Sequence, residues 1–391
     1  GVTQKEVFLN RDKIGVPTVI TKDNGRSFHG PMAPLGIHPD RVQVKYKEDG
    51  GADADGIIYV RPGVKDTSLG KSSYAQVRIL VGDKHYLKGM AIYKDGLPDG
   101  VDLQFNTNKS NTGNKLDALK KVEPNSPKNN PFGSDIKPGG QILEFGKGGK
   151  ATVTSVMNKV NEEGDWYNWR KSLSSQVLSK QSPSLAKEQL ALKRKARIAE
   201  FEEIMSLTNP TVKRNLLQKF SEAVDGDAVE LQAHKMPRQS TNVIFPIKSL
   251  NPNHVYAPNY KDGETVVLIR YPHAGRFEIP ELTVNNKNKE GRSLLGQAAD
   301  AIGIHPKVAE QLSGADFDGD TVLVIPNNNK KFKVDKALEG LKDFDPRATY
   351  KAYDGMPQIT TKQKGTQMGL VSNLITDTVS YTHLRAHETR G

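Results

Sequence analysis

Three aspartates at alternate positions constrain this chain more than any other feature of its sequence. Asp316, Asp318 and Asp320 lie in the segment GADFDGDTVLVIP, between a helix-like stretch and an apolar strand. In a fully extended strand, alternate side chains lie about 6–7 Å apart, which is too far to share one small ion. Gly319 gives the backbone the freedom to curl until the carboxylates converge. The sequence therefore predicts a tight acidic loop between a helix and a buried strand.

A hard divalent cation would relieve the repulsion among the three carboxylates. Mg²⁺ suits the loop, because a site with few protein carboxylates leaves positions open for water and phosphate. A solvated acidic turn without an ion is the alternative. An EF-hand loop beginning at Asp316 would need Gly and Glu at its sixth and twelfth positions, where the chain has Thr321 and Asn327. A phosphatase-type DxDGT loop would follow a buried apolar strand, whereas Glu310 and Gln311 precede this loop.

Length and composition place the loop in a large, basic protein. The 391 residues suffice for two or three domains, and the net charge of +11 favours nucleic acid as partner, with a merely basic protein as the alternative. Cysteine is absent, which excludes disulfides, thiolate zinc sites and cysteine nucleophiles. No apolar run approaches the roughly 20 residues that cross a bilayer, and no signal peptide is recognisable. We expect a soluble, cytoplasmic protein that does not associate with membranes.

The pattern along the chain predicts two β domains separated by helices. Strand-like runs such as YAQVRILV (74–81) alternate with turn residues over 1–150, and strands return over 241–350, the range that carries the acidic loop. Between them, 151–240 has apolar residues at helical spacing among many charges, which predicts a helical connector with Asn209 as an N-cap and Pro210 in a first turn. Its basic face is either solvated or in contact with phosphates; it carries Lys193, Arg194, Lys195 and Arg197.

The end of the sequence predicts a helix and then a non-native tail. Residues 351–379 again show helical apolar spacing, whereas 380–391 read SYTHLRAHETRG and resemble a translated sequencing adaptor. We therefore expect a fragment of a longer chain that continues beyond about Val379.

Three motifs in order resemble the large catalytic subunit of multisubunit RNA polymerases, whose active-site loop reads NADFDGD. They are VVLIRYP (266–272), IGIHPKVAEQLSG (302–314) and ADFDGDTVLV (315–324), with Gly314 where the family usually has Asn. Having both β domains on one chain is similar to single-chain phage RNA polymerases and to the RNA-dependent RNA polymerases of RNA silencing. The resemblance implies an α+β fold with two double-psi β-barrels, joined by the basic helical connector and followed by a helix.

The same resemblance implies roles for residues of the second β domain. Asp316, Asp318 and Asp320 would hold the first Mg²⁺ of a two-metal mechanism, and the second ion would arrive with the nucleoside triphosphate. Arg270, at the end of an apolar strand, would contact the sugar or phosphate of the nucleotide. A surface salt bridge at the end of a strand is the alternative for Arg270.

In the first β domain, the resemblance implies lysines that face the triphosphate. GDKHYLKGMAIY (82–93) is similar to the family's lysine segment, with Lys88 as the better candidate and Lys84 as the rival, and Lys109 is a further candidate. GADADGIIYV (51–60) is similar to the family's acidic segment, with Asp55 in the place of one acid and Ala54 where the other would stand. Asp55 is therefore a candidate ligand for the second metal.

The implied function is template-directed RNA synthesis. We expect a DNA-directed, phage-encoded RNA polymerase core that works in the host cytoplasm with a DNA template, nascent RNA and nucleoside triphosphates. One alternative is an RNA-dependent RNA polymerase, since no motif reports the template. The other is a catalytically silent nucleic-acid-binding scaffold, and a fragment that lacks the segment after Val379 could itself be inactive.

Overall fold

The computed structural model describes residues 19–21, 27–29, 31–123, 131–133, 135–147, 151–160, 181–230, 236–270, 275–312 and 314–337, with scattered positions from 339 to 374. The chain divides into two compact units, residues 1–342 and residues 343–391. In the second unit, the described positions between Gln363 and Leu374 are helical, within the helix predicted over 351–379. The tail predicted at 380–391 lies outside the described residues.

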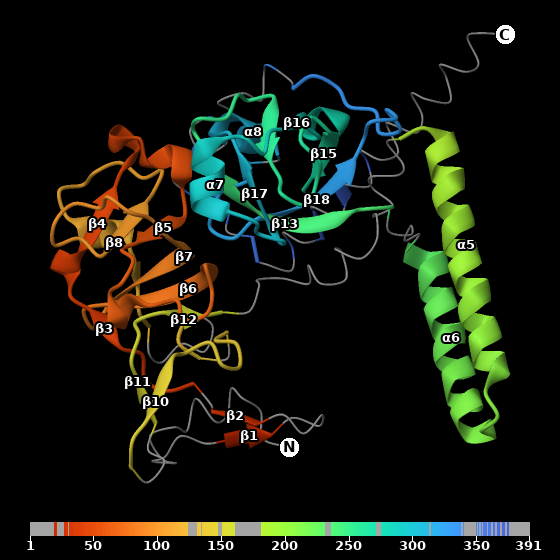
Figure 1. Ribbon diagram of the computed structural model, residues 1–391, viewed down its shortest axis with the longest axis horizontal. Coiled ribbons are helices and arrows are strands. Elements are labelled where there is room, and N and C mark those ends of the chain that lie inside the picture. The colour runs from red at the N-terminus through yellow and green to blue at the C-terminus, as the bar shows by residue number, and fades with distance from the viewer. Residues whose placement is uncertain are drawn as a thin grey trace. The chain divides into compact units, whose positions relative to one another are not determined.

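The first unit contains two large β-sheets (Figure 1). The strands of the first sheet follow the order β12-β6-β7-β5-β8-β4, with β3 beside β6 and β9 beside β7. Successive side chains of a strand point to opposite faces of the sheet, and both faces of this sheet are apolar. Ile58 and Val60 of β5 lie in one core, and Ile57 and Tyr59 lie in another. Its strands are β3 (Gly36–Ile37), β4 (Val42–Lys45), β5 (Ile57–Val60), β6 (Tyr74–Val81), β7 (His85–Tyr93), β8 (Leu103–Asn106), β9 (Lys120–Lys121) and β12 (Asn158–Lys159).

The second sheet is a closed barrel in the order β13-β17-β14-β16-β15-β18. The antiparallel pairing of β13 with β18 closes it. Buried β-branched residues such as Val266, Val267 and Ile302 explain why these segments form strands. The strands are β13 (Ser240–Pro246), β14 (His254–Tyr256), β15 (Thr265–Ile269), β16 (Glu281–Val284), β17 (Ala301–Ile304) and β18 (Thr321–Pro326), with helices α7 (Lys289–Leu295) and α8 (Pro306–Gln311) between them.

The two sheets share one pairing plan. The parallel pairs β4–β8 and β5–β7 correspond to β13–β17 and β14–β16. The antiparallel pairs β5–β8, β6–β7 and β6–β12 correspond to β14–β17, β15–β16 and β15–β18. Among the described residues, only the closing pair β13–β18 lacks a counterpart in the first sheet. Within the described residues, the first sheet thus follows the pairing plan of the barrel without its closing pair.

These pairings confirm the α+β class and a barrel in the second β domain. Two double-psi β-barrels were expected, and the first sheet departs from that expectation because the only strand that β12 pairs with in the described part of the chain is β6. Closure of a barrel requires its two end strands to pair, and β4 and β12 do not pair in the described residues.

One apolar core joins the two sheets. Met90 and Ile92 of β7 belong to the same buried cluster as the barrel residues Phe245 and Val324. The ring of Tyr74 on β6 meets the ring of Phe245 edge to face, with centroids 5.1 Å apart. Because burying a large apolar side chain stabilises a fold by about 1.5–3 kcal/mol, this shared core fixes how the barrel sits against the first sheet.

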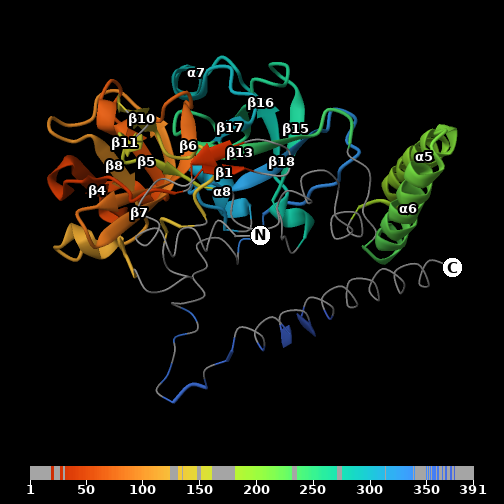
Figure 2. The same ribbon diagram turned by 90° about the horizontal axis from the view of Figure 1, so that it is seen from below.

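Two antiparallel helices occupy part of the predicted connector: α5 (Pro183–Ser206) and α6 (Pro210–Glu230), which lie side by side in both views (Figures 1 and 2). Their starts follow the capping rules. At the start of α5, the Ser182 hydroxyl accepts a hydrogen bond from the Leu185 amide. At the start of α6, Asn209 directly precedes Pro210, and its side chain accepts hydrogen bonds from the Thr211 and Val212 amides, which confirms the predicted cap. None of the helices in the described residues is both long and apolar enough to span a bilayer.

Short elements complete the described chain. Two further hairpins pair β1 (Val19–Thr21) with β2 (Ser27–His29), and β10 (Leu143–Phe145) with β11 (Ala151–Val153). Single turns of 3-10 helix are η1 (Pro39–Arg41), η2 (Lys47–Asp49), η3 (Gly51–Ala54), η4 (Lys65–Thr67), η5 (Lys115–Ala118) and η7 (Arg276–Glu278).

Candidate functional site

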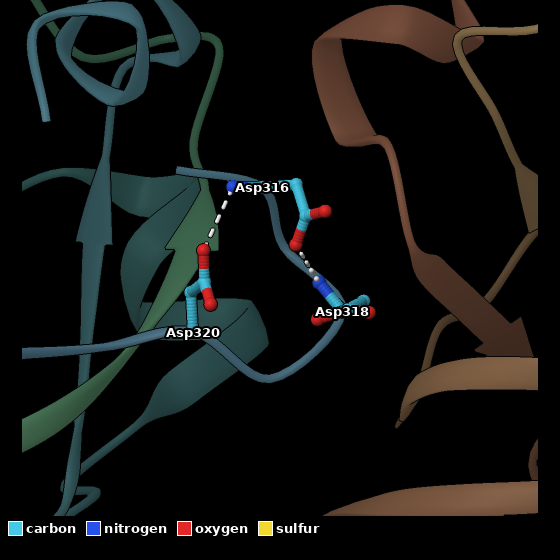
Figure 3. A group of neighbouring side chains, drawn as sticks. All are labelled: Asp316, Asp318 and Asp320. Atoms are coloured by element: carbon cyan, nitrogen blue, oxygen red, sulfur yellow. Dashed lines mark hydrogen bonds between the residues drawn. The ribbon is translucent and has the colours of Figure 1, made fainter. Parts of the chain in front are cut away.

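The acidic loop joins α8 to β18 and is curled so that its three carboxylates converge (Figure 3). One oxygen from each of Asp316, Asp318 and Asp320 lies within 4.8 Å of the others. The Asp316 amide donates to Asp320 Oδ2 at 3.0 Å, and the Asp318 amide donates to Asp316 Oδ1 at 3.1 Å. Gly319 makes the turn with φ +130°, a backbone conformation that residues other than glycine rarely adopt. The predicted convergence of the three residues is therefore present.

Gathering three carboxylates in a half-buried loop has an electrostatic cost. Burial, together with the charges of Asp318 and Asp320, raises the pKa of Asp316 to about 7. Burial also raises the pKa of Asp320, and the neighbouring Arg270 opposes that rise. A bound cation would remove this cost. The donor set, three oxygens without nitrogen or sulfur, suits a hard divalent ion such as Mg²⁺.

Two basic side chains meet the loop from the two sheets. Lys88 Nζ, on β7 of the first sheet, lies 3.4 Å from Asp318 Oδ2. Arg270 follows β15 of the barrel, and its guanidinium lies 2.9 Å from Asp320 Oδ2. Both basic side chains are less than one-fifth exposed, with accessible fractions of 19% and 18%. Attraction between these partly desolvated charges is stronger than between charges at the protein surface. Lys88 and Arg270 were both candidate site residues in the sequence analysis.

The first sheet also contacts the backbone of the loop. The Phe317 amide donates to the Asp55 carbonyl at 2.9 Å, and Gln76 Nε2 donates to the Asp318 carbonyl at 3.1 Å. Gly56 comes so close that a Cβ on it would lie 2.5 Å from Cβ of Asp318. Sequence reasoning missed Gln76 and Gly56, because a contact across about 240 residues leaves no local pattern.

The other candidates of the first β domain lie around this site with different partners. The Asp55 carboxylate accepts the Asn108 amide at 3.0 Å, and its pKa is raised mainly by burial and further by the charge of Asp318. Lys109 Nζ donates to the Ala118 carbonyl at 2.9 Å, although its charge still acts on Asp55. Lys84 is exposed in the turn between β6 and β7. Of the three candidate lysines, Lys88 is the one that contacts the acidic loop.

The basic residues predicted for template binding lie on α5. Lys193, Arg194, Lys195 and Arg197 all fall within that helix. Arg197 pairs with Glu200 three positions later and lies 6.0 Å from the ring centroid of Phe220 on α6. Contact of this helix with phosphates stays a prediction.

Comparisons with known proteins found likeness among solved structures, and none among family models or curated proteins. No protein-family model matches the sequence, and no curated protein is significantly similar to it. Among solved structures, the chain is similar to the RNA-dependent RNA polymerase QDE-1 from Thielavia terrestris, with a TM-score of 0.49 and 13% sequence identity. The match covers 79% of this chain and 38% of the solved chain, so this chain spans well under half of that protein.

Proposed function

We propose that this chain is the two-sheet core of a template-directed RNA polymerase, which transfers a nucleoside monophosphate from a triphosphate to an RNA 3′-hydroxyl. The observation that carries the proposal is the contact of 3.4 Å between Lys88 Nζ and Asp318 Oδ2. In the two-barrel polymerases that the sequence resembles, one barrel supplies metal carboxylates and its partner supplies lysines. The common pairing plan of the two sheets supports the same assignment.

Asp316, Asp318 and Asp320 are the residues that would hold Mg²⁺. When bound, the ion supplies Lewis-acid activation of the attacking hydroxyl and neutralises charge on the phosphate. The protein's own contribution is to keep the three carboxylates together through the amides of Asp316 and Asp318. It also keeps them partly away from water, which strengthens their hold on a cation.

Lys88 and Arg270 are placed to act on the nucleotide. Lys88 carries a fixed positive charge beside the loop, where it would balance the negative charge that develops on the departing pyrophosphate. Arg270 offers a planar fork suited to phosphate or sugar oxygens, and its contact with Asp320 sets the orientation of that fork. Asp55 is the candidate for a second ion, with Ala54 beside it in place of a second acid.

DNA and RNA are the two candidate templates. The sequence led us to expect DNA and a phage origin, with RNA as the alternative. The similar solved protein is by its title RNA-dependent. Both are therefore tested together.

The test is incorporation of labelled ribonucleotides on primed DNA and primed RNA with Mg²⁺. The protein is compared with Asp318→Asn and with the control Asp262→Asn, whose carboxylate pairs with Lys287 away from the acidic loop. We expect template-dependent extension by the protein and by the control, and loss of extension in Asp318→Asn. Equal extension by all three proteins would contradict the proposal. No extension by any of them, together with salt-sensitive binding of template, would favour the silent scaffold.

A further inference from the structure

The β6–β7 hairpin presents one row of side chains to the barrel. In its register, Tyr74 lies opposite Ile92, and Gln76 lies opposite Met90. Met90 and Ile92 belong to the core shared with the barrel. Because alternate residues of a strand point to the same face, Gln76 and Lys88 lie on this same face. The hairpin therefore directs one amide and one ammonium group toward the acidic loop.

Gln76 fits against the tightest part of that loop. Its Nε2 donates to the Asp318 carbonyl at 3.1 Å. The next residue, Gly319, has φ +130°, and a Cβ added there would lie 2.8 Å from Nε2 and 2.9 Å from Cδ of Gln76. Two independent features thus meet at one place: a long-range hydrogen bond, and a glycine whose missing side chain leaves room for the donor.

We propose that Gln76 is a positioning residue for the metal loop, an inference that rests on the proposed function. By holding the Asp318 peptide, Gln76 fixes the point at which the chain turns between Asp318 and Asp320. The Phe317 amide is held by the Asp55 carbonyl at 2.9 Å on the other side of Asp318. The first sheet therefore sets the spacing of carboxylates that belong to the barrel.

The chemistry of the amide suits this task. A Lys or Arg at position 76 would bring a charge that competes with a metal ion for the carboxylates, as Lys88 already does at Asp318. An apolar side chain would leave the carbonyl without this donor in a partly buried loop, which is unfavourable. Glutamine donates a hydrogen bond and leaves the charge of the loop unchanged.

The experiment measures Mn²⁺ affinity by electron paramagnetic resonance, without nucleotide, on the full chain. Gln76→Met keeps a long unbranched side chain and removes the donor. The matched control is Gln104→Met, because Gln104 is also a half-buried strand residue and its amide donates to Gln43 at 2.7 Å, in the β4–β8 pair. We expect Mn²⁺ binding to weaken about 10- to 100-fold in Gln76→Met, as for other residues that orient metal ligands, and to be unchanged in the control.

A second readout separates positioning from a general loss of folding. Incorporation by Gln76→Met should require more Mn²⁺ for half its maximal rate, and the rate should approach that of the unmodified protein when Mn²⁺ is saturating. Gly319→Ala, which displaces the Gln76 side chain, should weaken Mn²⁺ binding as well. If Gln76→Met fails to fold, Gln76→Ala takes its place, since it removes the donor and adds no atoms.

Asp318→Asn distinguishes the two levels of failure. If Asp318→Asn leaves Mn²⁺ affinity unchanged, the metal site is wrong, and the proposed function falls together with this inference. If Asp318→Asn weakens binding and the folded Gln76 variants bind as tightly as the Gln104→Met control, only the positioning role is overturned.

Discussion

Gly56 provides the sharpest test of how the two sheets meet. The residue precedes β5, has φ +89°, and faces the acidic loop so closely that an added Cβ would lie 2.5 Å from Cβ and 2.6 Å from the amide nitrogen of Asp318. Gly56→Ala therefore forces either the loop or β5 to move. Gly63 is a matched control, because it has φ +81° and an added Cβ there would meet nothing within 4 Å.

The magnitude follows from two separate costs. An alanine in the left-handed region costs about 1–2 kcal/mol, and this cost applies to both variants. Overpacking against a fixed neighbour costs about 1–3 kcal/mol more, and only Gly56→Ala incurs it. We expect Gly56→Ala to lower the free energy of unfolding by about 2–5 kcal/mol and Gly63→Ala to lower it by about 1–2 kcal/mol.

Urea denaturation measures both changes, provided that the slope of the free energy against urea is the same in the two variants. Mn²⁺ affinity adds a local readout, since displacement of Asp318 should weaken metal binding in Gly56→Ala and leave it unchanged in Gly63→Ala. Equal losses of stability, combined with equal Mn²⁺ affinities, would show that the loop does not approach Gly56. The account of a loop held by the first sheet would then be wrong.

Three further predictions concern charged residues. Lys88→Met should lower kcat for nucleotide incorporation about 10²- to 10³-fold, as expected for a lost preorganised donor; a normal kcat would exclude Lys88 from the chemistry. Arg270→Lys keeps the positive charge and loses the planar fork of the guanidinium. KM for the triphosphate should therefore rise about tenfold, which corresponds to the loss of one charge-assisted hydrogen bond. An unchanged KM would indicate that Arg270 forms only a structural salt bridge. The hydrogen bonds that Arg238 donates to Glu264 lower the pKa of that carboxyl below its ordinary value. The stability that this ion pair contributes is fully present above the ordinary pKa of a glutamate and is lost as the pH falls through the lowered pKa. Glu264→Gln should therefore lower the free energy of unfolding by about 1.5–3 kcal/mol at neutral pH and by little in acid. A loss of stability that does not change with pH, measured by urea denaturation, would contradict this prediction.

Local patterns in the sequence predicted two local features of the structure correctly. The alternation of Asp316, Asp318 and Asp320 with a glycine at 319 pointed to a curled loop, because the repulsion and the backbone freedom are both properties of neighbouring residues. Asn209 was predicted as a cap for the same reason, since an N-cap acts on amides only two or three positions away.

Residues of the first β domain were harder to judge. Lys88 and Lys109 were both candidates by resemblance, but only Lys88 reaches the loop, because Lys109 Nζ donates to the Ala118 carbonyl. Gln76 carried no signal at all, since a single glutamine in a strand looks like any half-exposed polar residue. The missing closure of the first sheet, as far as the described residues go, was not foreseen either, because closure depends on pairing between two end strands, β4 and β12, that lie more than 100 residues apart.

The sequence by itself determined the chemistry that the chain carries: three clustered carboxylates, a strand-end arginine, and strands and helices whose limits depend on neighbouring residues. The tertiary structure decided which distant groups act on that loop. Lys88, Gln76, Gly56 and the Asp55 carbonyl reach it because the core shared by the two sheets brings β5, β6 and β7 beside the segment between α8 and β18. Hydrophobic burial is not directional, so no pattern within a single segment could specify this meeting.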